Sequence, residues 1–143
     1  MLISHVLKGK GGQVHTLSAE ATLAEAAREL DVRRVGALVV TDESGRLTGV
    51  FSERDLVREV GRRGAACLHD KVSSAMTRGV ITASMDETVD EGLERMTDRR
   101  IRHLPVVDDG RLIGIVSIGD LVKLRIARAE AEAAAMQAYI SAG

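Results

Sequence analysis

The sequence predicts a mixed α/β fold of the α+β kind, in which two pseudo-symmetric β-α-β-β-α repeats pack as one module. Three observations favour it. The chain aligns with itself at a shift of 66 residues, which becomes 65 after a one-residue deletion in a turn. Each copy has one stretch with helical spacing of apolar residues, and each continues into two β-rich runs. Because the repeat is long and occurs only twice, it is typical of a pseudo-symmetric pair rather than of an array.

The two copies share identical residues at equivalent positions. These pairs are Thr22/Thr88, Glu25/Glu91, Leu38/Leu104, Asp42/Asp108, Gly49/Gly114, Ser52/Ser117 and Asp55/Asp120. The alignment divides the chain into a first repeat (1–60), a connecting segment (61–71), a second repeat (72–126) and a C-terminal helical extension (127–143). With 143 residues the chain is long enough for one ordinary domain with a shared core.

An amphipathic helix is the first element with a clear pattern in both copies. Its apolar positions follow the spacing i, i+3, i+4, i+7. They are Leu23, Ala26, Ala27 and Leu30 in the first copy and Val89, Gly92, Leu93 and Met96 in the second. A threonine stands before each helix, and a glutamate follows three residues later. This is the spacing of a capping box, so both helix starts are marked.

A β-hairpin and a second helix complete each copy. The runs ALVVT and LTGVF flank DESG in the first copy, and LPVV and LIGIV flank DDG in the second. Apolar β-rich runs around a glycine-containing turn predict a hairpin. Ser52 and Ser117 follow the hairpins, each with an aspartate three residues later. This capping-box spacing predicts a helix start at both serines.

The connection between the copies and the C-terminus have different compositions. GRRGAACLHDK, residues 61–71, is glycine-bearing, charged and aperiodic, which predicts a surface connection with Cys67 as a free structural or solvent-facing thiol. After Asp120 the content of Ala, Glu and Arg favours an extended helix. Met136, Tyr139 and Ile140 share one face of it, and this face needs either another part of the chain or a second subunit as its partner.

Composition and charge argue against several classes of function. The net charge is −1, and the chain has one Phe, one Tyr and no Trp, so a nucleic-acid partner is not expected. No apolar run approaches the roughly 20 residues that span a bilayer. The N-terminus lacks the pattern of a secretory signal, so we expect a cytoplasmic protein. The four histidines and Cys67 show no metal-ligand spacing, and we expect neither an enzyme nor a required cofactor.

The segment VITASMDETVDEGLERMTDRRIRHLPVVDDGRLIGIVSIGDLV closely resembles the CBS domain, named after cystathionine β-synthase, and the first copy matches it less closely. With ISHVLKGKG before the first copy and VSSAMTRG before the second, the resemblance covers nearly the whole chain. It implies that two CBS repeats pack sheet against sheet as a Bateman module with two clefts. Family members bind adenosine-containing ligands there, such as AMP, ADP, ATP, NAD or S-adenosylmethionine, and so regulate a partner or attached domain.

The resemblance assigns the ligand's ribose to the aspartate of each Ser-x-x-Asp pattern, which is Asp55 or Asp120. It assigns Ser52 and Ser117 to the sugar or phosphate. The chemistry is suitable, because an ionised carboxylate accepts hydrogen bonds from both ribose hydroxyls. The same spacing caps a helix without any ligand, so capping alone is the alternative.

Basic residues before the LPVV strand bind ligand phosphates in the family, which implies this role for Arg102 and His103. The first copy has Gly36 and Ala37 at these positions. Since neighbours in a strand point to opposite faces, both side chains reach one phosphate only where the strand is irregular, and Pro105 favours irregularity. Alternatively, Arg102 is a solvated surface charge and His103 a packed or exposed strand residue.

Further candidates follow from the same resemblance. They are Arg54, Thr16, Thr82, Val80, Ile81 and Ile115. Arg54 would reach a phosphate from the first copy, or be an exposed arginine of a first helical turn. The two threonines begin the copies, where backbone groups of family members recognise adenine. The aliphatic residues would flank the adenine, or belong to the core.

Together these observations predict a non-catalytic regulatory module that binds an adenosine nucleotide between its repeats. Ser117 and Asp120 form its stronger site, and NAD and AMP are the first candidates by resemblance. We expect a homodimer that acts as a sensor or accessory subunit on an unidentified protein partner in trans. The rival hypothesis is a ligand-free scaffold that works through dimerisation and its C-terminal helix.

Overall fold

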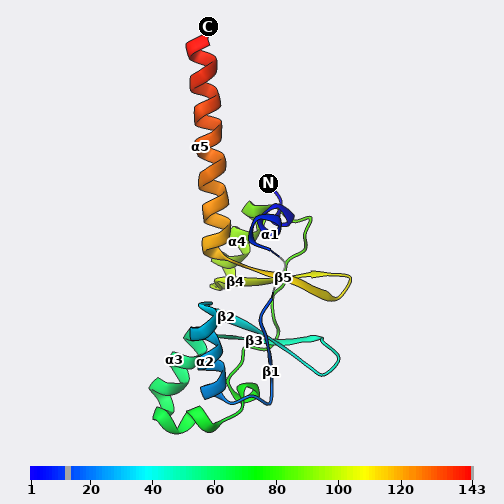
Figure 1. Cartoon of the computed structure of the whole chain (residues 1–143), viewed down its shortest axis with the longest axis vertical. Coiled ribbons are helices and arrows are strands. Elements are labelled where there is room, and N and C mark those ends of the chain that lie inside the picture. Colours follow the sequence, from blue (N-terminus) through cyan, green and yellow to red (C-terminus); the bar gives the residue numbers. More distant parts are fainter. Residues whose placement is uncertain (12–13, 143) are drawn as a thin grey trace.

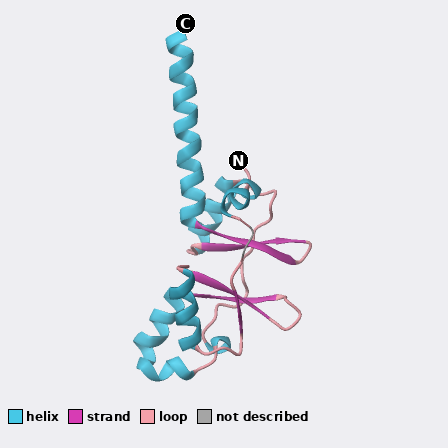
Figure 2. Cartoon of the chain, in the orientation of Figure 1, coloured by secondary structure: helices cyan, strands magenta, loops and turns pink. Residues whose placement is uncertain are grey.

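The computed structural model describes residues 1–11 and 14–142, which form two sheets with helices on their outer sides (Figures 1 and 2). Residues 12 and 13 of the predicted first repeat and residue 143 of the predicted C-terminal extension lie outside the described part. The helices are α1 (Ile3–Lys10), α2 (Leu23–Arg33), α3 (Glu53–Arg63), α4 (Val89–Arg99) and α5 (Ile118–Ala142), with 3₁₀ helices at Gly64–His69 and Val72–Ser74. The strands are β1 (Thr16–Ser18), β2 (Ala37–Thr41), β3 (Leu47–Ser52), β4 (His103–Asp108) and β5 (Arg111–Ser117). The predicted mixed architecture of two repeats is confirmed.

The two sheets differ by one strand. In the first, β1 runs parallel to β2, and β2 pairs with β3 as a hairpin. The second sheet has only the hairpin β4-β5, and the predicted first strand of that repeat is reduced to a single parallel bridge between Ala83 and Val106. The equivalent positions explain this difference. The N–H of Val39 donates to His15 beside β1, whereas its counterpart Pro105 has no N–H to donate.

The predicted helix starts and hairpins are confirmed. The hydroxyl oxygens of Thr22 and Thr88 accept hydrogen bonds from the N–H groups of Glu25 and Glu91, at 3.1 and 3.0 Å. The turn between β4 and β5 consists of Asp109 and Gly110, at φ values of 50° and 76°. Two consecutive positive φ values are those of a type I′ turn, whose twist suits a two-residue hairpin.

Each repeat has its own core, and the segment that precedes one repeat packs on the other. Ile3, Val6 and Leu7 of α1 are buried with residues of α4, β4 and β5. Val72, Ala75 and Met76 are buried with residues of α2, β2 and β3. Packing therefore crosses the boundaries that the sequence order predicts for the two repeats.

Two equivalent glycines accept these crossing segments. A Cβ placed on Gly49 would lie 2.7 Å from the sulfur of Met76, and one placed on Gly114 would lie 2.6 Å from Cδ2 of Leu7. Both distances are far below an ordinary contact of about 3.5–4.0 Å between nonbonded carbon atoms. The shared Gly49/Gly114 pair thus has a packing role, because the strand backbone must leave room for a side chain.

The connecting segment is mostly exposed, as predicted, but it is more regular than its composition indicates. Within residues 61–71, α3 continues to Arg63 and a 3₁₀ helix follows at Gly64–His69. Cys67 is buried in the first core, with Leu68 packed against that core. Cys67 is therefore the structural one of its two predicted alternatives, because the short helix turns its thiol inward beside apolar neighbours.

Helix α5 extends far beyond the sheets (Figure 1). Near its start Leu121 is fully buried, but Met136, Tyr139 and Ile140 are 61%, 79% and 69% exposed. The predicted extended helix is confirmed, and the described residues of the chain do not cover its apolar face. Among the described residues, no helix combines the length and hydropathy needed for a membrane span.

Candidate functional site

The predicted site of the second repeat gathers where β4 begins and β5 ends. His103 and Ser117 are direct partners in the β4-β5 register. The N–H of Ser117 donates to Oδ2 of Asp120 at 2.8 Å, and the N–H of Asp120 donates to Oγ of Ser117 at 3.1 Å. This reciprocal cap fixes the aspartate in the first turn of α5. The predicted capping is confirmed, and it leaves part of the carboxylate open to other partners.

Lys10 is a member of this site that the sequence did not reveal. It is the last residue of α1, and its Nζ lies 2.7 Å from Oδ2 of Asp120 and 3.0 Å from the carbonyl oxygen of Ile115. Burial raises the pKa of Asp120, but the hydrogen bonds from Lys10 and Ser117 outweigh it and hold that pKa below its ordinary value of 3.8. The carboxylate is therefore ionised at neutral pH, with a lysine as its counter-ion.

His103 joins the two repeats. A Cβ placed on Gly36 would lie 3.4 Å from both Cε1 and Nε2 of His103, so the imidazole packs directly on the Gly36 backbone. Burial and the charge of Lys10 lower the pKa of His103 below 6.5, although Glu53 and Asp120 act in the opposite direction. The ring is thus neutral at neutral pH. Gly36 of the first copy and His103 of the second are thus in contact across the two repeats.

Arg102 lies outside the strand. It is exposed in the bend before β4, and its carbonyl oxygen accepts a hydrogen bond from the N–H of Ile118 at 2.8 Å. Because Arg102 precedes β4, the alternation of side chains along a strand does not force Arg102 and His103 to opposite faces. The charge of Arg102 contributes to lowering the pKa of His103, so its guanidinium belongs to the electrostatic surroundings of the site.

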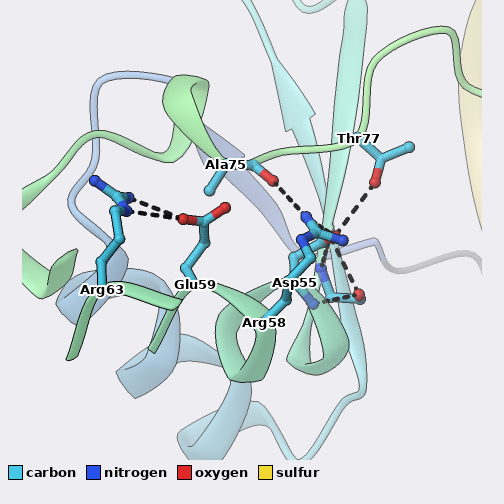
Figure 3. A network of polar contacts seen from close by, with 7 residues as sticks. Asp55, Arg58, Glu59, Arg63, Ala75 and Thr77 are labelled. Atoms are coloured by element: carbon cyan, nitrogen blue, oxygen red, sulfur yellow. Dashed lines mark hydrogen bonds and ion pairs between the residues drawn. The ribbon is translucent and has the colours of Figure 1, made fainter. Parts of the chain in front are cut away.

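The equivalent site of the first repeat is closed (Figure 3). Oδ2 of Asp55 accepts hydrogen bonds from the N–H and Oγ of Ser52 at 2.9 and 3.1 Å. Its Oδ1 accepts from Nη2 of Arg58 at 2.9 Å and from Oγ1 of Thr77 at 3.4 Å. Both carboxylate oxygens are thus engaged within the protein.

The two aspartates therefore differ in access although their capping is alike. The side chain of Asp55 is 6% exposed, against 26% for Asp120. The position equivalent to Arg58 is Lys123, an exposed residue of α5. Among the described residues, no hydrogen bond reaches Oδ1 of Asp120. In the described part of the chain, Asp120 therefore keeps an oxygen without a protein partner, which Asp55 lacks.

The remaining candidates are less closely associated. Arg54 is exposed in the first turn of α3, and Ile115 belongs to the site through its carbonyl oxygen. Val80, Ile81 and Thr82 are half-buried; Ile81 packs against the second core, and the carbonyl oxygen of Thr82 accepts a hydrogen bond from Arg95. Among the described residues, none of these three hydrogen-bonds to Ser117 or Asp120.

Thr16 lies apart from both aspartates. It lines a cavity of about 620 Å³ between the two hairpin turns, together with Arg46 and Arg111. Neither Asp55 nor Asp120 lines this cavity. No cluster of potential metal ligands occurs within residues 1–11 and 14–142.

Comparison with known proteins identifies relatives of the whole module. The family model of the CBS domain matches residues 12–62 and 72–127. The structure of a CBS-domain-containing protein from Agrobacterium tumefaciens is 45% identical and has a TM-score of 0.85, over 87% of this chain and 92% of that one.

Two further similar structures contain adenosine compounds. A CBS-domain protein from Pyrobaculum aerophilum complexed with AMP is 32% identical, with a TM-score of 0.75, over 84% of this chain and 89% of that chain. The CBS domain pair of protein MJ0100, in complex with 5′-methylthioadenosine and S-adenosylmethionine, is 29% identical with a TM-score of 0.80, over 90% of this chain and 98% of that chain.

Proposed function

The chain belongs to the CBS-domain family, and on that premise we propose that it is a non-catalytic regulatory module whose second repeat binds an adenosine nucleotide. Asp120 would accept hydrogen bonds from the ribose hydroxyls beside Ser117. Arg102 and His103 would face the phosphate. AMP and NAD are the first candidates, and the protein would act as a cytoplasmic sensor or accessory subunit for a protein partner.

The observation that carries this proposal is the different state of two equivalent aspartates. Asp55 has protein partners on both carboxylate oxygens, whereas Asp120 is bound on Oδ2 alone. An ionised carboxylate with a free oxygen accepts a hydroxyl hydrogen without loss of its helix cap. The AMP-bound and methylthioadenosine-bound relatives support an adenosine compound as the ligand class.

Thermal unfolding in the presence of ligands tests the proposal. AMP, ATP, NAD, NADH and S-adenosylmethionine are each added at millimolar concentration to ligand-free protein. A ligand present at about 100 times its Kd stabilises the fold by roughly 2.7 kcal/mol, which raises the Tm of a chain of this size by about 5 °C or more. Asp120→Ala should abolish the shift. The control Asp98→Ala, an exposed position of α4, should retain it. The absence of a shift with every ligand contradicts the proposal.

A second candidate function, a scaffold that works through dimerisation, is favoured by α5. A row of exposed apolar and small residues recurs along it at spacings of four and three, as in the seam of a coiled coil. They are Val122, Ile126, Ala129, Ala133, Met136 and Ile140. We therefore propose a homodimer as well. Light scattering should show that Met136→Glu dissociates it, while Ala131→Glu, off the seam, does not; a wild-type monomer contradicts it.

A further inference from the structure

We infer that Lys10 selects the ligand of the second repeat, because it leaves Asp120 when a nucleotide binds and pairs with the phosphate of that nucleotide instead. This inference rests on the proposed function. In the structure Lys10 is the internal counter-ion of the carboxylate. When a ribose takes its place at Asp120, the ammonium becomes available to a phosphate. The lysine thus opposes neutral nucleosides and favours phosphorylated ones.

The contacts of Lys10 define this competition. Its Nζ donates to Oδ2 of Asp120 at 2.7 Å and to the carbonyl oxygen of Ile115 at 3.0 Å. Oδ2 also accepts the N–H of Ser117. A ribose diol that uses both carboxylate oxygens therefore meets an oxygen that already has two donors. Lys10 must give way there, whereas the backbone N–H of Ser117 is fixed by the helix cap.

The surroundings determine where a displaced ammonium finds a partner. The charges of Lys10, Arg102, Glu53 and Asp120 all act on the neutral His103, so these groups surround one imidazole. The Lys10 and Asp120 side chains are 38% and 26% exposed, so their pair is partly solvated and is able to open without leaving a buried charge. A ligand phosphate near Arg102 and His103 would supply a full negative charge within reach of Lys10. A charge-assisted contact of this kind replaces the one that is lost.

Neutral and anionic ligands should therefore respond in opposite directions to the loss of the lysine charge. Adenosine displaces Lys10 from Asp120 and offers no new anion, so wild-type protein binds it against a cost. AMP displaces the same lysine and provides its phosphate instead. Lys10→Met keeps the length and apolar character of the side chain, and it removes the competitor from Asp120 as well as the cation for the phosphate.

Isothermal titration with AMP and adenosine on the full chain tests the inference. The variants are Lys10→Met and the control Lys8→Met, which removes the same charge from an exposed position of the same helix. We expect Lys10→Met to bind adenosine more tightly and AMP more weakly than wild type. The ratio of the AMP affinity to the adenosine affinity should fall by about tenfold or more, as when other charge-assisted contacts are lost. Lys8→Met should leave it near the wild-type value.

The outcomes separate this inference from the proposed function. A ratio that is unchanged in Lys10→Met, or that falls equally in Lys8→Met, overturns the role of Lys10 while the binding function stands. Wild-type protein that binds neither compound overturns the proposed AMP site and the inference together. Circular dichroism of each variant shows whether the fold is retained. Since the Lys10–Asp120 pair is partly exposed, both variants should unfold within about 1 kcal/mol of wild type.

Discussion

Gly114→Ala tests whether α1 docks on the second sheet and so brings Lys10 to Asp120. The added methyl group would lie 2.6 Å from Cδ2 and 3.2 Å from Cδ1 of Leu7. An ordinary carbon–carbon contact needs about 3.5–4.0 Å, so Leu7 must move by roughly an ångström. Leu7 is only 7% exposed and is packed in the second core. Its displacement therefore disturbs the packing of the second core.

The expected loss of stability follows from this overlap. Adding a methylene to a packed core costs about 1–3 kcal/mol. The lower backbone entropy of an unfolded chain with alanine offsets about 0.5–1 kcal/mol of it. The variant should thus be less stable by roughly 0–2.5 kcal/mol, with about 1 kcal/mol at the middle of this range. As a matched control, Gly61 lies inside α3 and a Cβ there meets nothing within 4 Å. Gly61→Ala should therefore be more stable than wild type by about 0.5–1 kcal/mol.

Urea unfolding followed by far-ultraviolet circular dichroism measures these free energies. Leu7→Ala alone should cost about 2–5 kcal/mol, as for other buried leucines. In the Gly114→Ala background it should cost less, because the new methyl group occupies part of the vacated space. We expect the two changes to depart from additivity by roughly 1 kcal/mol. A Gly114→Ala variant that is stabilised as much as Gly61→Ala, or strict additivity with Leu7→Ala, would refute the docking of α1 on β5.

Two further predictions concern the titratable groups. Asp55→Asn should lower the stability by about 1–3 kcal/mol, yet it should leave AMP binding intact, because the amide keeps an oxygen for Arg58 and Thr77 but turns an NH₂ donor toward the N–H of Ser52 and removes the charge that pairs with Arg58; loss of binding with an unchanged unfolding curve would contradict the structural role of Asp55. In nuclear magnetic resonance titration, burial and Lys10 should hold the pKa of His103 below 6.5 in the free protein, and AMP should raise it. Since the unfolded chain binds this proton first, stability should fall as the pH drops below 6.5. A pKa that AMP does not move would argue against contact with the phosphate.

Most of the fold could be predicted from local patterns that both copies repeat. Capping at Thr22, Thr88, Ser52 and Ser117 and the hairpin runs involve residues close in sequence, so their spacing carries the signal. The missing strand near Ala83 depends on a residue more than twenty positions away, since Pro105 offers no N–H to a neighbour. That pairing is visible only when the two segments are placed side by side.

The sequence predicts the site residues that lie in the duplicated motif, but it does not predict Lys10, which completes the site. Ser117 and Asp120 lie in the shared pattern, and His103 lies beside them in register. Lys10 is 110 residues from Asp120, in a segment whose counterpart has no lysine at the equivalent place. Only the docking of Leu7 on Gly114 brings this lysine to the carboxylate. The sequence offered one signal for this docking: both copies have the glycine of the Gly49/Gly114 pair, and apolar residues precede each repeat.

The ligand site and the proposed dimer seam lie on one helix. Asp120 belongs to the first turn of α5, and Met136 lies four turns further along it. If occupancy of the site changes dimerisation by some factor, dimerisation must change ligand affinity by the same factor, because linkage is reciprocal. We therefore expect Met136→Glu, which touches no part of the site, to alter the affinity for AMP, with Ala131→Glu as the unaltered control. Titration calorimetry of wild type and both variants measures it. Equal affinities in all three would mean that α5 does not couple the two events, and that a regulated partner must read the ligand from the repeats themselves.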